Sequence, residues 1–152
     1  MSEGPLVSLV VPGQPRGQGR PRFYRRGRGV GTYKPQEDAD YAEAIAYQWR
    51  EAGAVHLDGA LELTVDAVFA RPKGHWRTNG GLNAQGRRKP DHLQKPDLDN
   101  IVKSVKDGLN GLAYDDDAQI ISIGARKRWS SDRDTHEGFL VVYLIPRREE
   151  NA

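Results

Sequence analysis

The chain has 152 residues, of which 37% are hydrophobic and 29% are charged, and its formal net charge is +2. This length is enough for one domain with a core but too short for two. No apolar run approaches the ~20 residues of a membrane helix, no signal peptide is evident, and the absence of Cys excludes disulfides and thiolate zinc sites, so we expect a cytoplasmic protein.

Two strands and one helix are expected in the first half of the chain. The apolar run 6–11 predicts a first strand, and residues 35–52 are helix formers with early acids that suit the helix dipole. Residues 60–70 alternate apolar and polar side chains, which predicts a half-buried strand. Glu62 and Asp66 lie on its polar face, where we interpret them as solvated charges, with a supporting role near a metal site as the alternative.

Two basic segments, residues 14–34 and 71–95, interrupt these elements. The first contains seven cations and no acid, and the second contains seven cations and one acid. Because cations neutralise phosphates and rings such as Phe23, Tyr24 and Tyr33 stack on unpaired bases, we predict contacts with the DNA backbone; a solvated loop is the alternative. The cations assigned to DNA binding are Arg16, Arg20, Arg22, Arg25, Arg26, Arg28, Lys73, Arg87, Arg88, Lys89 and Lys95.

The second basic segment also contains three aromatic residues, His75, Trp76 and His92. Trp76 is expected to help hold the DNA strands. His75 and His92 do not have the spacing of zinc ligands, and His92 is close enough in sequence to Asp97 for a DNA contact.

The strongest pattern in the sequence spans residues 95–120. Its apolar residues recur at the spacing of one helix stripe, and Asp97 is a good N-cap, so Asp97 and Asp99 are expected at the start of a helix. Asp99, Lys103 and Asp107 recur every four residues and form a polar column on that helix.

Asp115, Asp116 and Asp117 follow this helix after a short turn, and residues 120–123 predict a strand that packs against it. This route can return Asp117 toward the start of the helix. Magnesium prefers oxygen ligands and keeps positions open for a substrate phosphate, so these carboxylates suit a metal site, with a lysine stabilising negative charge. Taken singly, the same residues also fit an N-cap, a surface ion-pair ladder and an aspartate-rich turn.

The C-terminal part predicts two further strands, residues 118–129 and 138–145, for which a hairpin is the simplest connection. The cations 126–128 are interpreted as solvated charge. In order, the elements β-α-β-α-β-β predict a single α/β domain of the α+β type, with a mixed or mostly antiparallel sheet and two helices.

The same central segment carries a family resemblance. The runs PDLDN at 96–100, DGLNG at 107–111 and YDDDAQI at 114–120, together with Lys103, resemble the signature of the RusA family of Holliday junction resolvases, the crossover junction endodeoxyribonucleases. Weaker similarity includes GRPRF at 19–23.

The resemblance implies one RusA-like nuclease domain over residues 1–152. It implies a homodimeric phosphodiester hydrolase that depends on Mg²⁺, with Mn²⁺ as the alternative, and that nicks four-way DNA junctions symmetrically in recombination and repair, in a bacterial or phage-infected cell. Matched position by position, the essential acids and metal ligands are Asp97, Asp99 and Asp117, with Asp116 as an alternative ligand, and the catalytic lysine is Lys103. Asn100 and Asp107 are then expected to support these groups.

Three other functions remain open from the sequence. A non-catalytic basic DNA-binding protein would use only the cations, and a metal-dependent nuclease of other DNA structures would use the same acids. A different phosphotransfer enzyme is disfavoured, because haloacid-dehalogenase-like phosphatases place their Asp pair after a buried strand, whereas Lys95-Pro96 and a basic segment precede this pair.

Overall fold

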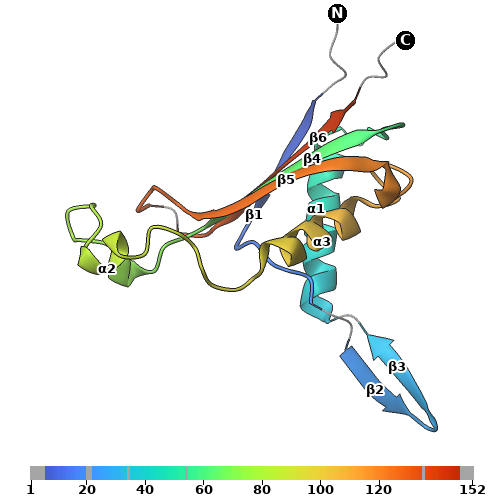
Figure 1. Cartoon of the computed structure of the whole chain (residues 1–152), viewed down its shortest axis with the longest axis horizontal. Coiled ribbons are helices and arrows are strands. Elements are labelled where there is room, and N and C mark those ends of the chain that lie inside the picture. The colour runs from blue at the N-terminus through green and yellow to red at the C-terminus, as the bar shows by residue number, and fades with distance from the viewer. Residues whose placement is uncertain (1–5, 20–21, 34, 54, 135, 148–152) are drawn as a thin grey trace, which may run out of the picture.

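The structure is a computed structural model of the chain and describes residues 6–19, 22–33, 35–53, 55–134 and 136–147. The chain forms a curved main sheet with two longer helices, α1 (Gln36–Glu51) and α3 (Leu98–Leu109), packed beside it (Figure 1). In chain order, the elements are β1 (Val7–Pro12), β2 (Arg22–Arg26), β3 (Gly29–Tyr33), α1, β4 (Leu61–Phe69), η1 (Lys73–His75), α2 (Ala84–Arg87), α3, η2 (Asp117–Gln119), β5 (Ile120–Trp129) and β6 (Phe139–Pro146).

The main sheet has the strand order β1-β6-β4-β5. β4 runs parallel to β5 and antiparallel to β6, and β1 is antiparallel to β6, so the predicted mixed sheet is confirmed. The predicted hairpin between the last two strands is wrong, because β4 lies between them. β4 is an inner strand, and its inward side chains are buried. α3 lies in the crossover that connects the parallel strands β4 and β5.

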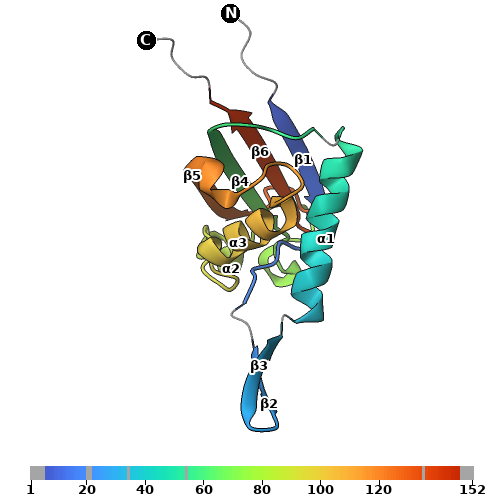
Figure 2. The same cartoon turned by 90° about the vertical axis from the view of Figure 1, so that its right-hand side faces the viewer.

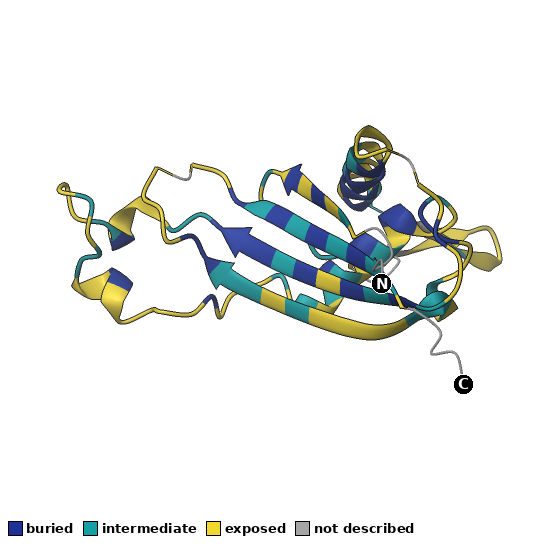
Figure 3. Cartoon of the chain, turned by 90° about the horizontal axis from the view of Figure 1, so that it is seen from above, coloured by how far each residue is buried: buried dark blue, intermediate teal, exposed yellow. Residues whose placement is uncertain are grey.

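Both long helices lie on one face of this sheet (Figure 2). Along the strands, buried residues alternate with more exposed ones, so one face forms the core and the other faces outward (Figure 3). Trp49 of α1 and Phe69 of β4 are fully buried in this core. At Gly108, an added Cβ would lie 2.7 Å from the Ala42 carbonyl oxygen, so α1 and α3 are in close contact there.

The two basic segments have more structure than loops. In the first, β2 and β3 form a separate two-stranded sheet that projects from the body of the molecule (Figure 1). In the second, His75 is buried and His92 is stacked on Phe69 with the ring centroids 3.9 Å apart. The structure therefore places His92 in the core and not at a surface that DNA could reach. None of the described helices is long and apolar enough to cross a membrane.

Candidate active site

The first predicted acid lies at the N-cap of α3. The backbone of Asp97 is extended, as an N-cap requires, but its side chain makes no capping hydrogen bond. Its two carboxylate oxygens instead accept hydrogen bonds from the Lys95 ammonium at 2.8 and 2.9 Å. This contact holds the pKa of Asp97 below its usual value, so the carboxylate is charged at neutral pH and available beside the helix N-terminus.

Lys127, on β5, fixes the segment that leads into this acid. Its ammonium donates hydrogen bonds to the carbonyl oxygens of Gln94 at 2.6 Å and Pro96 at 3.1 Å. Its charge also contributes to the lowered pKa of Asp97. Sequence reasoning treated Lys127 as solvated charge. Lys127 pairs with the buried Ala67 of β4, so its side chain points to the face of the sheet that the helices cover. The sequence did not reveal this strand pairing.

The N-terminal part of the first basic segment is packed against the start of α3. The Gln18 amide donates to the Asn100 carbonyl oxygen at 3.0 Å, and the Ser104 hydroxyl donates to the Arg16 carbonyl oxygen at 3.0 Å. At Gly17, an added Cβ would lie only 2.8 Å from the Pro96 Cβ. Only glycine therefore allows this chain segment to run so close to the residues that precede Asp97.

The predicted DNA contacts differ in how the structure uses them. Arg16 pairs with Glu37 at 2.6 Å and with the buried Asp38 at 3.5 Å, which anchors its segment to α1. Lys95 is paired with Asp97. The remaining described cations of the set lie on β2, on the β2–β3 turn or in the 71–95 segment, whereas Arg20 lies outside the described residues.

Asp99 and Lys103 are exposed on α3 and line a groove between this helix and β5. The walls of this groove are largely apolar, formed by Leu98, Val102, Lys106, Ile123 and Ala125. Asp107 is exposed one helical turn after Lys103.

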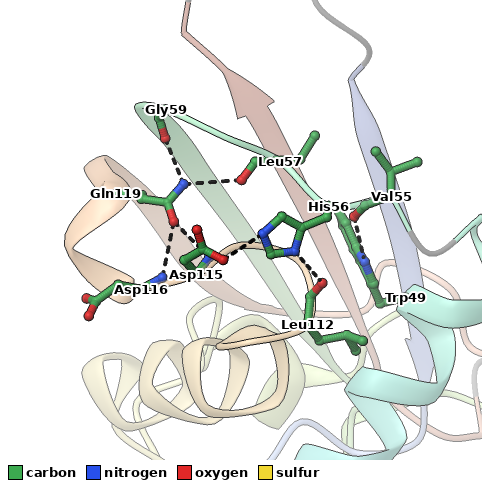
Figure 4. Close-up of polar contacts among 9 residues, drawn as sticks. All are labelled: Trp49, Val55, His56, Leu57, Gly59, Leu112, Asp115, Asp116 and Gln119. Atoms are coloured by element: carbon green, nitrogen blue, oxygen red, sulfur yellow. Dashed lines mark hydrogen bonds and ion pairs between the residues drawn. The ribbon is translucent and has the colours of Figure 1, made fainter.

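The three consecutive aspartates after α3 have three different partners. Asp115 accepts a hydrogen bond from the His56 ring at 2.9 Å, as Figure 4 shows. Asp116 accepts from the Ala118 amide at 2.7 Å and so caps the short helix η2. Asp117 accepts from the Tyr114 hydroxyl at 2.8 Å, and burial together with this carboxylate raises the pKa of Tyr114.

Asp117 lies at the far end of α3 from Asp97 and Asp99. The Tyr114 hydroxyl that binds Asp117 is 3.5 Å from the Lys106 carbonyl oxygen. Lys106 comes seven residues after Asp99, which corresponds to roughly 10 Å along the helix axis. Within one chain, the residues 115–119 therefore do not return to the start of the helix.

A different group of side chains is close enough to share an ion in the described part of the chain. His56, Asp58 and Asp115 have ligand atoms within 4.8 Å of one another, whereas Asp97, Asp99 and Asp117 do not form such a group. All three members are exposed, and the His56 ring also bonds the Leu112 carbonyl oxygen. That carbonyl and then Asp115 raise the pKa of His56.

His56 and Gln119 hold this turn in place. The Gln119 side-chain amide donates to the carbonyl oxygens of Leu57 and Gly59, and its oxygen accepts from the amides of Asp115 and Asp116 (Figure 4). Sequence analysis missed both residues because the hydrogen bonds that join the two segments, from His56 to Asp115 and from Gln119 to Leu57 and Gly59, connect positions about 60 apart in the chain. We interpret this cluster as the clamp that positions residues 115–117.

The site combines exposed carboxylates at a helix N-terminus with a lysine one turn later and with flanking basic segments. This combination is typical of proteins that cleave phosphodiester bonds in nucleic acid. Comparison with known proteins identifies the family. Residues 12–136 match the family described as Endodeoxyribonuclease RusA, and the chain belongs to this family of nucleases. A Bacillus subtilis (strain 168) protein described as "Uncharacterized protein YqaN" is 29% identical over 129 residues, which is 83% of this chain and 89% of that protein.

Proposed function

We propose that this protein is a magnesium-dependent endonuclease that resolves four-way DNA junctions by paired symmetric nicks in recombination and repair. Family membership supports cleavage of DNA. The observation that carries the proposal is the pair of exposed carboxylates, Asp97 and Asp99, at the start of α3, next to a groove that holds Lys103. A DNA substrate of this kind places the enzyme in the cytoplasm of a bacterial or phage-infected cell.

The donor set fits a hard divalent cation. Asp97, Asp99 and Asp117 offer carboxylate oxygens, and Asp97 is not used to cap its helix. Bound Mg²⁺, or Mn²⁺ in its place, would supply Lewis-acid stabilisation of the phosphate in the transition state. Asp117 suits this role better than Asp116, because the Asp116 carboxylate caps η2.

The remaining groups of the site stabilise charge on the phosphate or hold the reacting residues in position. Lys103 stabilises negative charge that develops on the phosphate, because this residue lies one helical turn after Asp99 and lines the same groove. Lys127 and the residues around Asn100 hold the start of α3, and with it Asp97, in a fixed position. Asp107, one turn after Lys103, is placed to orient that lysine.

We further propose that the active form is a homodimer in which each site is shared. Asp97 and Asp99 lie at one end of α3, and Asp117 lies near the other. A two-fold axis that passes beside the middle of α3, perpendicular to the helix, would pair α3 with its antiparallel copy and bring Asp117 of the partner subunit toward Asp97 and Asp99. Two such sites on a symmetric dimer suit two nicks in opposed strands.

The surface around this helix supports contact with a second copy. β5 is an edge strand of the described sheet, and Ile121 and Ile123 on it are 52% and 48% exposed. The adjoining groove adds the apolar side chains of Leu98 and Val102. An unpaired strand edge with exposed apolar residues is a surface that a partner chain can cover.

The proposal is tested with purified protein, a synthetic four-way junction and a linear duplex of matched sequence, each with Mg²⁺, Mn²⁺ or a chelator. We expect metal-dependent cleavage of the junction in preference to the duplex. Asp99→Asn should abolish cleavage while junction binding survives or improves, because phosphate repulsion falls. Binding without any metal-dependent cut would instead indicate a non-catalytic DNA-binding protein, and equal cutting of both DNAs would indicate a nuclease of other structures.

A further inference from the structure

The β2–β3 hairpin lies outside the main sheet. It forms a two-stranded sheet of its own, joined by a turn at Gly27-Arg28 in which Gly27 has φ +57°. It extends outward from the end of the molecule where α1 begins (Figures 1 and 2). A hairpin that adds nothing to the core is only marginally stable by itself, so its sequence must be explained by what it contacts.

The strand register divides the hairpin into two faces. Directly paired residues share a face, as do residues two apart on one strand, so Phe23, Arg25 and Val30, the partner of Arg25, lie on the same face. Phe23 is 75% exposed and Val30 is 71% exposed. This face therefore presents an uncovered aromatic ring and an aliphatic side chain beside the cationic Arg25.

The opposite face is built differently. Tyr24 pairs with Gly31, and a Cβ added to Gly31 would clash with the Tyr24 ring, so this ring lies over the glycine backbone. One aromatic ring thus packs against the hairpin itself, whereas Phe23 projects outward.

Charge identifies the partner of the hairpin. Arg25, Arg26 and Arg28 lie on or beside the hairpin, and residues 14–34 contain no acid, so the partner is a polyanion. A continuous duplex offers phosphates but buries its base faces. An exposed ring next to cations matches DNA whose base stacking is interrupted, since aromatic side chains stack on accessible bases.

The hairpin is also attached close to the proposed site. Gln18 is hydrogen bonded to Asn100, two residues after the N-terminal end of α3. The hairpin begins four residues later at Arg22, so its base lies at most roughly 14 Å from that contact even when the chain is fully extended. Two paired strands are also narrow enough to enter a DNA groove of about 12 Å.

We propose that the β2–β3 hairpin inserts at the branch point of the four-way junction, where Phe23 stacks on a base exposed by the interrupted helix. This inference rests on the proposed function, because it takes the branched DNA as the substrate. It assigns recognition of the branch to Phe23 and general attraction to the hairpin arginines.

The test compares Phe23→Ala and Phe23→Trp in the full chain, with Val10→Ala as the control for loss of an exposed apolar side chain on the main sheet. Metal-free binding is measured to a four-way junction with 2-aminopurine at the branch point and to a linear duplex. Phe23→Ala should weaken junction binding about five-fold or more, with duplex binding unchanged and the 2-aminopurine response lost. Phe23→Trp and Val10→Ala should retain native junction binding and the 2-aminopurine response.

An equal loss on junction and duplex, or no loss with Phe23→Ala, would overturn the inference. Because no metal is present, this readout does not depend on cleavage. A protein that never cuts DNA but loses junction binding with Phe23→Ala keeps the inference and loses the nuclease function. A protein that cuts junctions and does not respond to Phe23→Ala keeps the function and loses the inference.

Discussion

Lys127→Met is the most informative substitution outside the acids. The native ammonium makes two hydrogen bonds, to the carbonyl oxygens of Gln94 and Pro96, and Met retains the length of the side chain without a donor. Hydrogen bonds from charged groups are worth roughly 1.5–3 kcal/mol each when buried, but water can replace these partly exposed ones, so we expect a loss of about 1–2 kcal/mol in the free energy of unfolding.

The expected loss of activity is larger than that loss of stability implies. Residues 94–96 lead directly into Asp97, and misplacing a reacting group by about 1 Å can cost on the order of 100-fold in rate. Single-turnover junction cleavage should therefore fall about 10- to 100-fold, with metal-free junction binding retained. Denaturant unfolding and cleavage assays measure the two effects separately.

Arg126→Gln provides the matched control. Arg126 is adjacent in β5 and also loses one positive charge, but it pairs with Asp66 on the opposite face of the sheet, at 3.2 Å. It should leave cleavage nearly unchanged. Equal cleavage losses in both variants, or full activity in Lys127→Met, would refute a positioning role for Lys127.

Three further predictions follow from the packing and the pKa values. Gly17→Ala should reduce cleavage at least about ten-fold, because the new Cβ displaces Pro96; normal single-turnover rates would contradict this. Gly108→Ala should lower the unfolding free energy by about 1–3 kcal/mol in denaturant titrations, because the new Cβ meets α1; an unchanged midpoint would contradict it. The raised pKa of His56 means that its protonated form stabilises the fold below the unfolded pKa of 6.5 and that this contribution is lost as pH rises through the folded value. His56→Gln should therefore destabilise more at acidic than at alkaline pH in thermal melts, and a pH-independent difference would contradict the assignment.

Local patterns predicted the helices and strands well. The apolar stripe of α3 and the alternation in β4 depend only on neighbouring residues, and both elements form within a residue or two of the expected ends. The β2–β3 hairpin was missed because a run rich in Arg and Gly has little alternation of apolar side chains, and its turn at Gly27 was the main local signal.

Long-range pairing was much less accessible from sequence. The insertion of β4 between β5 and β6 depends on which buried strand takes the centre, and neighbours in sequence gave the wrong pair. The positioning role of Lys127 depends on the same register. For the site, the resemblance gave the residue types, but only the structure separates Asp117 from Asp97 along α3.

A subunit-complementation experiment tests the shared site most directly. Asp99→Asn and Asp117→Asn chains with different affinity tags are co-expressed, and the heterodimer is purified and assayed on a four-way junction with Mg²⁺. In a shared arrangement, both lesions fall in one site and the other site is intact. The account predicts that each homodimer is inactive and that the heterodimer nicks one strand of the junction. A heterodimer as inactive as the two homodimers, or an active homodimer of either variant, would contradict it.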